Sequence, residues 1–361
     1  MPPPTSLLTR LALGLALAAC GDPSPPTAIV ELASSGDTVA TGYADVADGA
    51  WLGGSRWAVV APMDVTVGIL DLAGKRVVPL GGEGTKELGN PATAFVTEDT
   101  LHVGDWGLRR TSLWTLGGRL VRTVPSFDGA RGALPQARDA AGNFYLALAP
   151  RPGPDGSGNR DSAAVIRVSP DLAAFDTVAR LAPLDVAEVA AENGRRFERR
   201  ALSGEDVWGV LPDGSLWVAR VYENRVEWRD PDGEWARGEP LPDRVLEVTR
   251  YDREVFYQRF PPELRGTAEQ LPFAAVKPPF EAGLTASSGH VWLEKSRAPV
   301  DSARRYHEVD RRGRLVREVR VPGPGRIVAL GDGVALVAER VRDGTRFIRF
   351  PIQPPPAQAA R

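Results

Sequence analysis

Short apolar segments recur along this chain, and each follows a turn of small or polar residues. A second strand-like segment and a turn rich in Asp and Gly come after each one. The clearest copies are PDGSLWVAR (212–220), SSGHVWLEK (287–295), AAGNFYLAL (140–148) and GDGVALVAE (331–339), and looser copies are GGSRWAVVA (53–61) and EDTLHVGDW (98–106). A strand unit that repeats every roughly 40–50 residues indicates radial repetition. The pattern therefore predicts an all-β fold, a six-bladed β-propeller.

Each predicted blade holds four antiparallel strands, and Asp-Gly or Gly-Gly pairs supply the positive φ angles of the hairpin turns between them. The predicted blades are 47–81, 93–124, 136–181, 205–241, 283–322 and 326–352. The sixth blade lacks a fourth strand, whereas the apolar segment 27–34 precedes the first blade without a partner. We predict that 27–34 pairs with 345–352, which would close the ring and protect both sheet edges.

Two segments interrupt the repeat. Residues 182–204 separate the third and fourth blades, and residues 242–282 separate the fourth and fifth. Within the second, 243–260 has apolar residues nearer to helical than to strand spacing, so it predicts a helix that Asp243 would cap. Connections between blades emerge on the same face as the loops between second and third strands, including 150–162. We expect all three segments to decorate one face.

The N-terminus has the features of an export signal. Arg10 precedes the apolar run 11–19, which is too short to span a bilayer, and Cys20 is the single cysteine of the chain. The ending Leu17-Ala18-Ala19-Cys20 resembles the bacterial lipobox, which implies removal of residues 1–19 and acylation of Cys20. Residues 20–26 would then be a lipidated tether, and Gly21 favours the outer membrane by the same resemblance. A plain signal peptide with an incidental cysteine is the alternative.

The repeat can be compared with a known group. The turns and strands behind a lipobox resemble bacterial six-bladed β-propeller lipoproteins of the NHL/TolB-like group. The phrase PLGGEGTKELGNP (79–91) is similar to an NHL repeat, with Gly82, Gly84, Leu88 and Pro91 in matching places. The resemblance covers 27–352 and leaves 353–361 as a tail that we expect to be disordered. It implies the fold but little about function, because members include enzymes and scaffolds.

The charged residues exclude few functions, but they indicate which surface could bind a ligand. The formal net charge is −2, so nucleic acid is not an expected partner. Four of the 44 basic residues are lysines, which leaves 40 arginines. The arginines assigned to the decorated face are Arg109, Arg110, Arg138, Arg195, Arg196, Arg199, Arg200, Arg297, Arg304, Arg305 and Arg342. Clustered guanidinium groups bind carboxylate or phosphate, but they also form solvated surfaces paired with Asp and Glu.

The residues that carry chemistry give no strong motif. Gly-x-Ser-x-Gly is absent, and His102, His290 and His307 do not have metal-site spacing, so no metal site is predicted from them. The first strands of the blades offer the carboxylates Asp48, Asp139, Glu205 and Asp206, which a lactonase-like enzyme could use with a divalent metal. The loop 155–161, with Asp155, Asn159 and Asp161, is either a calcium loop or a simple surface loop.

Aromatic residues divide into two groups. Trp57, Tyr145, Trp217 and Trp292 hold equivalent second-strand places and are typical of core packing. Trp51 and Trp208 fall on first strands, where they would line the central channel. The candidate ligand-binding residues are therefore Trp51, Arg109, Arg138, Trp208 and Arg297.

Three functions remain open on the sequence. The first is a lipid-anchored propeller, monomeric and without a cofactor, that binds a ligand or protein on its decorated face. The second is an envelope hydrolase or lyase that uses the channel carboxylates and a divalent metal such as Ca²⁺. The third is a subunit of an envelope complex. Oxygen ligands converging in the channel would favour the enzyme, and a large apolar patch would favour the complex.

Overall fold

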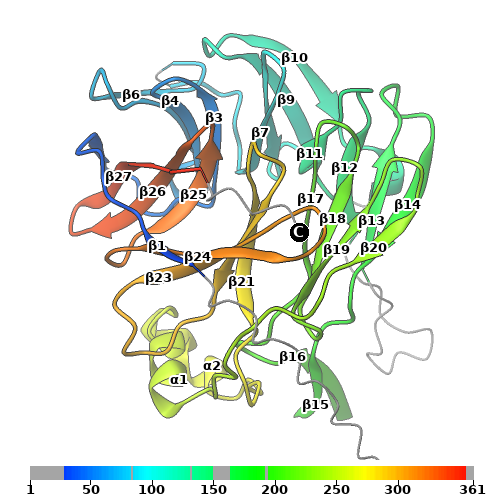
Figure 1. Cartoon of the computed structure of the whole chain (residues 1–361), viewed down its shortest axis with the longest axis vertical. Coiled ribbons are helices and arrows are strands. Elements are labelled where there is room, and N and C mark those ends of the chain that lie inside the picture. Colours follow the sequence, from blue (N-terminus) through cyan, green and yellow to red (C-terminus); the bar gives the residue numbers. More distant parts are fainter. Residues whose placement is uncertain (1–27, 83, 131, 149–162, 192–193, 355–361) are drawn as a thin grey trace, which may run out of the picture.

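The computed structural model describes residues 28–354, apart from 83, 131, 149–162 and 192–193. Six sheets surround a central axis in it, and Figure 1 shows them arranged as a ring. The chain is thus a six-bladed β-propeller, as its repeat predicts.

The first four blades follow the chain in order, and neighbouring strands in each are antiparallel. Blade one contains β3 (Asp48–Gly53), β4 (Arg56–Ala61), β5 (Thr66–Asp71) and β6 (Arg76–Pro79). Blade two contains β7 (Pro91–Thr97), β8 (Thr100–Asp105), β9 (Arg110–Thr115) and β10 (Leu120–Pro125). Blade three contains β11 (Ala137–Arg138), β12 (Phe144–Leu148), β13 (Ala164–Val168) and β14 (Phe175–Arg180). Blade four contains β17 (Val207–Val210), β18 (Leu216–Arg220), β19 (Arg225–Arg229) and β20 (Trp235–Arg237).

The last two blades both receive a strand from the N-terminal segment. Blade five contains β21 (Phe280–Thr285), β22 (Val291–Lys295), β23 (Arg304–Val309) and β24 (Leu315–Val321), with β1 (Ile29–Glu31) added parallel to β24. Blade six contains β25 (Arg326–Gly331), β26 (Val334–Val341) and β27 (Gly344–Pro351), and β2 (Thr38–Thr41) is its fourth strand. Figure 1 shows β1, in blue, beside β24, in orange.

The N-terminal segment closes the ring, as predicted, but the strand that pairs with β27 is a different one. β2, and not the segment 27–34, pairs antiparallel with β27. The earlier segment contributes β1, which extends blade five. Two edges in adjacent blades were open, and the N-terminal segment covers both of them in succession, which the prediction of a single pairing did not anticipate.

The two insertions have different structures. The first contains the hairpin of β15 (Val186–Ala191) and β16 (Gly194–Arg199). The second contains α1 (Arg250–Tyr257), the 3₁₀ turns Pro262–Leu264 and the short helix α2 (Arg265–Ala268), and it ends before β21, which includes the last residues of the predicted segment. Two further 3₁₀ turns lie at Pro62–Asp64 and Asp128–Ala130.

The helix begins later than the sequence suggested. Thr249 is the N-cap of α1, with a reciprocal capping box to Asp252, whereas Asp243 forms an ion pair with Lys295 (2.8 Å). Asp243 therefore holds the start of the insertion against blade five. Among the described residues, no helix has the length and apolar character needed to cross a bilayer.

Large aromatic side chains fill the spaces between blades. Trp57, Tyr145, Trp217 and Trp292 are all buried, which confirms their role in packing. Gly283 of β21 in blade five shows how tight this packing is, because a Cβ there would lie 2.7 Å from the indole of Trp217 in blade four. Rigid contacts between blades give the loops on each face a fixed base.

Candidate functional site

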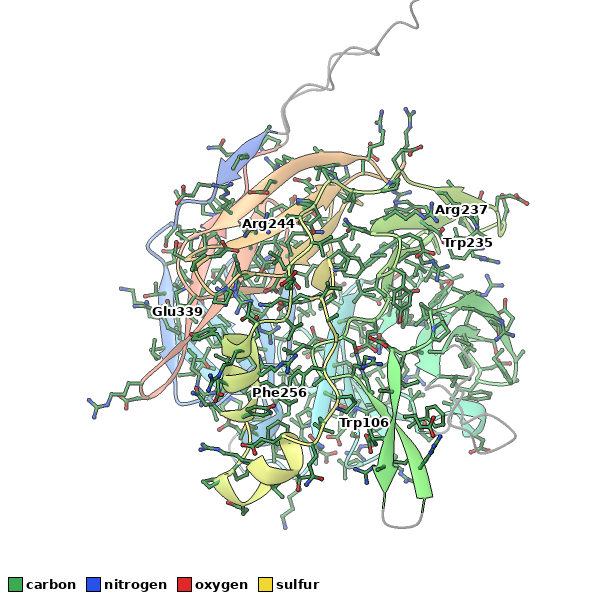
Figure 2. The ribbon with its side chains drawn as sticks, turned by 90° about the horizontal axis from the view of Figure 1, so that it is seen from below. Trp106, Trp235, Arg237, Arg244, Phe256 and Glu339 are labelled. Carbon is green, nitrogen blue, oxygen red and sulfur yellow. The ribbon has the colours of Figure 1, made fainter. Side chains whose placement is uncertain are left out.

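The decorated face carries a cleft between the two insertions. Strand alternation places the blade-to-blade connections and the second-to-third strand loops on this face. Figure 1 shows the hairpin and the helices projecting together, and Figure 2 shows Phe256 of α1 on the same side as Trp106 of blade two. The cleft has a volume of about 820 Å³ and is lined by 198–205, by α1 and the return segment up to Glu281, and by 296–304.

Backbone pairing joins the two insertions and forms the floor of the cleft. The Ala201 N–H donates to the carbonyl of Pro272 (2.7 Å), and the Ala274 N–H donates to the carbonyl of Ala201 (3.0 Å). Gly204 lies so close to Pro278 that an added Cβ would come within 2.3 Å of the proline Cβ. Only glycine fits there, so the two insertions are held in close contact along the base of the cleft.

Aromatic packing supports α1 from behind. Phe256 packs edge-on against Phe273, with ring centroids 5.4 Å apart, and lies 5.2 Å from Phe260. The Arg253 guanidinium lies over the Phe273 ring at 5.1 Å. Because these rings form a small core, α1 is more than a marginal surface helix.

Most charges at the cleft are paired. Lys277 binds the Asp252 carboxylate (2.5 Å) and donates to the carbonyl of Arg297 (2.7 Å). Burial by itself would raise the pKa of Asp252, but the hydrogen bonds from Lys277 and Thr249 outweigh it and hold that pKa below its usual value. Asp301 forms an ion pair with Arg244 (2.9 Å), and Glu205 one with Arg199 (3.5 Å).

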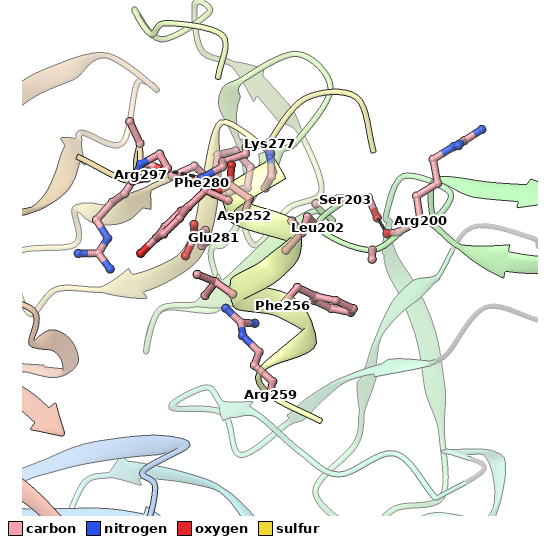
Figure 3. A pocket seen from close by; sticks show the side chains of 18 of the residues that line it. Arg200, Leu202, Ser203, Asp252, Phe256, Arg259, Lys277, Phe280, Glu281 and Arg297 are labelled. Atoms are coloured by element: carbon pink, nitrogen blue, oxygen red, sulfur yellow. Dashed lines mark hydrogen bonds and ion pairs between the residues drawn. The ribbon is translucent and has the colours of Figure 1, made fainter. Parts of the chain in front are cut away.

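Three charged side chains at the cleft stand apart from these pairs. Within the part of the chain that the structure describes, Arg259, Glu281 and Arg297 have no side-chain hydrogen bond or ion pair. All three line the cleft, and in Figure 3 Arg259 and Glu281 lie beside α1 while the guanidinium group of Arg297 points away from the helix. Val255, Phe256 and Leu271 supply apolar surface close to them. The cleft thus offers two unpaired guanidinium groups, one unpaired carboxylate and an apolar wall.

A second hollow adjoins the cleft. It has a volume of about 180 Å³, and its lining includes Asp45, Arg304, Arg326 and Arg340. Arg304 lines both spaces and forms an ion pair with Glu294. Arg326 donates to the carbonyl of Val46, so its guanidinium group is fixed to the start of blade one. The two hollows meet at one arginine.

The channel carboxylates do not converge on a common point. Asp139 accepts from Tyr145 (2.9 Å) and Asn143, and Asp206 accepts from Arg220 (2.9 Å) and the Val221 N–H (2.9 Å). Glu205 lies at the cleft. Among the described residues, no three His, Cys, Asp or Glu side chains gather closely enough to hold a metal ion.

Asp48 differs from the other channel carboxylates because its pKa is strongly raised. It accepts from the N–H groups of Gly49 (2.8 Å) and Ala94 (2.9 Å) and is half-buried at the start of β3. Burial raises the pKa of Asp48 to about 6, although the two N–H groups and Arg326 act in the opposite direction. A carboxyl group with such a pKa can exchange protons near neutral pH.

The three histidines lie in two blades, His102 in blade two and both His290 and His307 in blade five, and their surroundings differ. His102 and His307 are buried, and burial lowers the pKa of each to about 4. His290 is partly exposed and forms a 2.7 Å contact through Nδ1 with Glu308, which also accepts from Arg317 (2.5 Å). None of the three lines the cleft.

Of the five predicted ligand-binding residues, the structure places Arg297 in the cleft. Trp51 packs against Trp57 and Gly331, between blades one and six, and its indole N–H donates to the Gly54 carbonyl (3.2 Å). Trp208 is half-buried in the packing around blade four, and Arg109 is exposed on the loop after β8.

Arg138 corrects the assignment of arginines to the decorated face. It lies at the end of β11, beside the turn that leads to β12, and its guanidinium group donates to the Gly142 carbonyl (3.2 Å) and lies over Phe144. Connections from first to second strands emerge on the opposite face.

Sequence analysis missed Arg259, Lys277 and Glu281. The helical spacing of 243–260 was the one signal that could have pointed to Arg259, since it lies at the end of that segment. Cys20, residues 1–27 and the loop with Asp155, Asn159 and Asp161 lie outside the described residues.

Comparisons with known proteins give similarity in overall shape. No protein-family model matches the chain, and no curated protein matches it in sequence. A gluconolactonase from Xanthomonas campestris is 14% identical, with 86% of this chain and 89% of that one covered and a TM-score of 0.48. Virginiamycin B lyase from Staphylococcus aureus is 8% identical, with 88% and 98% covered and a TM-score of 0.49. A protein of unknown function from Bacteroides thetaiotaomicron is 12% identical, with 90% and 75% covered and a TM-score of 0.49. The fold assignment rests on the strand pairing of the chain itself.

Proposed function

We propose that this protein is an exported β-propeller, anchored through acylated Cys20 in the outer membrane, that binds a ligand in the cleft of its decorated face. The observation that carries the binding role is the group of Arg259, Glu281 and Arg297, which are unpaired beside an apolar wall while the charges around them are paired. Charged groups left without partners at a preformed concave site are available to a ligand.

Binding is favoured over catalysis by the state of the channel carboxylates. Asp139 and Asp206 are buried and accept hydrogen bonds from neighbouring side chains and backbone, which supports a structural role for both. The unpaired groups, in contrast, lie at the cleft. This supports a binding protein whose ligand is recognised by charge and shape.

A photo-crosslinking residue tests the binding role. Tyr251 lines the cleft and is 60% exposed, and Trp235 on the outer rim of blade four is 40% exposed (Figure 2). With benzoylphenylalanine at position 251, we expect a crosslinked product in intact cells that Arg297→Glu reduces. The same residue at position 235 is the control. Equal products from both positions would argue against a ligand site in the cleft.

Anchoring has an independent test. We expect Cys20→Ala to move the protein from the membrane fraction to the soluble fraction and to abolish labelling by a fatty-acid probe. Acyl chains contribute about 0.8 kcal/mol per buried CH₂, so losing them should release the protein. Membrane association that persists in Cys20→Ala would contradict acylation as the anchor.

Asp48 favours one alternative, an envelope hydrolase or lyase. A carboxyl group with a pKa of about 6 is suited to general acid–base catalysis. Its test is turnover of lactone substrates by the wild-type protein, with and without Ca²⁺, and by Asp48→Asn. Turnover that the substitution removes would establish the alternative, and its absence in the wild-type protein would leave Asp48 as a half-buried structural group.

A further inference from the structure

The arginines of the decorated face follow a path and do not form one cluster. The cleft contributes Arg259 and Arg297, the second hollow contributes Arg326 and Arg340, and Arg304 lines both. Of these five, Arg304 forms an ion pair with a carboxylate, and the other four have none among the described residues. A path of this kind fits an extended ligand better than a compact one.

Charge along the path is unbalanced. The unpaired carboxylates beside it are Glu281 in the cleft and Asp45 in the second hollow, against four guanidinium groups without a carboxylate partner. The excess of two positive charges is local, because the whole chain carries −2. Guanidinium groups at a partly enclosed surface bind carboxylate or phosphate groups, both of which can accept two parallel hydrogen bonds.

The remaining lining distinguishes between kinds of anionic chain. Val255, Phe256, Leu271 and Pro299 supply apolar surface, and none of the described residues that line the cleft is Asn or Gln. Sugar hydroxyl groups are usually bound by several amides and unpaired carboxylates, whereas here Asp252 and Asp301 already form ion pairs and Glu281 is the one unpaired carboxylate among the described lining residues. Apolar side chains, in contrast, gain directly from burial against such a wall. The lining therefore fits a peptide better than an acidic polysaccharide.

We propose that the cleft and the second hollow together bind an extended acidic peptide segment, with its carboxylates on the arginine path and its apolar side chains against the α1 wall. This inference rests on the proposed binding function and specifies its ligand. Arg304 is the point at which the peptide passes from one hollow to the other. Arg297 acts in the cleft and Arg340 in the second hollow.

The test measures binding of a fluorescein-labelled ten-residue peptide of alternating glutamate and leucine to the full protein by fluorescence anisotropy. We expect Arg297→Glu and Arg340→Glu each to weaken binding about tenfold, because each replaces an attractive charge with a repulsive one. Neither side chain makes a hydrogen bond in the described structure, so both variants should fold. Arg119→Glu is the matched control, since Arg119 is exposed between β9 and β10 on the opposite face.

Three results would overturn the inference. Equal binding of the peptide with glutamine in place of glutamate would show that its charge is not recognised. An unchanged affinity in Arg340→Glu would show that the ligand does not reach the second hollow. Tighter binding of an oligogalacturonate than of the peptide would identify a polysaccharide site. If the position-251 crosslink forms but the peptide fails, the inference is wrong while the binding function stands; if the crosslink also fails, both are wrong.

Discussion

His102 is a buried group whose removal should stabilise the protein. It is fully buried, stacks on Phe95 with ring centroids 4.7 Å apart and meets the edge of Phe144 at 6.1 Å. Neither ring nitrogen has a hydrogen-bond partner among the residues that the structure describes. His102→Phe keeps the aromatic contacts and removes both polar atoms. We therefore expect a gain in the free energy of unfolding.

The size of the gain depends on pH. An unpaired buried polar atom destabilises the folded protein by about 1–3 kcal/mol, which His102→Phe removes. The larger phenyl ring introduces about 1 kcal/mol of packing strain, so the net gain in the free energy of unfolding at pH 7 is about 1 kcal/mol. The pKa of His102 is lowered to about 4, chiefly by burial, whereas in the unfolded chain it is 6.5. Stability from the neutral ring is present above 6.5 and is lost as pH falls toward 4. Between pH 7 and pH 5 this loss is about 2 kcal/mol.

Urea unfolding at pH 7 and pH 5 measures both effects. The gain from His102→Phe should rise from about 1 kcal/mol at pH 7 to about 3 kcal/mol at pH 5. His102→Leu lacks both the ring nitrogens and the aromatic stacking. Its stability should depend on pH in the same way as that of His102→Phe, but should be lower than that of His102→Phe at each pH. If wild type and His102→Phe lose equal stability between the two pH values, His102 is not held neutral by burial and the reasoning fails.

Three further predictions concern the packing, the channel and the helical insertion. The pKa of Asp48 is raised to about 6, so its neutral carboxyl group stabilises the folded protein below the usual pKa of 3.8, and this contribution is lost as the pH rises through 6. Asp48→Asn should therefore reduce the change of the urea midpoint with pH between pH 5 and pH 8. A pH profile that the substitution leaves unaltered would argue against burial as the cause of the raised pKa. Gly209→Ala should lower the free energy of unfolding by about 1–3 kcal/mol because its Cβ would meet Trp217, whereas Gly42→Ala, with nothing within 4 Å, should leave the thermal midpoint unchanged or higher. Thr249→Ala should cost α1 about 1 kcal/mol, seen as faster hydrogen exchange in α1 with no change in the global urea midpoint; unchanged exchange would mean that the capping box contributes nothing.

The sequence predicts the blades well because a blade is made of local contacts. Each hairpin joins strands that are neighbours in the chain, and residues such as Gly214 and Gly313 provide the positive φ that its turn requires. The pairing of the N-terminal segment is different, since Val39 meets Phe347 more than three hundred residues away. Nothing local distinguishes β1 from β2 as the strand that completes blade six.

The cleft was only partly predictable. Arg297 was a candidate from its place in a loop of the decorated face. Arg259 and Glu281 became candidates only once their lack of partners was visible, since a charged residue in a sequence looks the same whether paired or free. Arg138 shows the converse, because an arginine assigned to the decorated face lies near the opposite one.

The sequence by itself determined a ring of six strand repeats and two insertions on one face, and it carries a single cysteine in a stretch that resembles a lipobox. These follow from periodicity and from short-range turn chemistry, which the chain carries locally. Tertiary structure alone decided which strand closes the ring, that Trp51 packs against Gly331, and that Arg259, Glu281 and Arg297 share one space. Those outcomes depend on long-range packing, in which segments far apart in the chain compete for the same edges and the same partners.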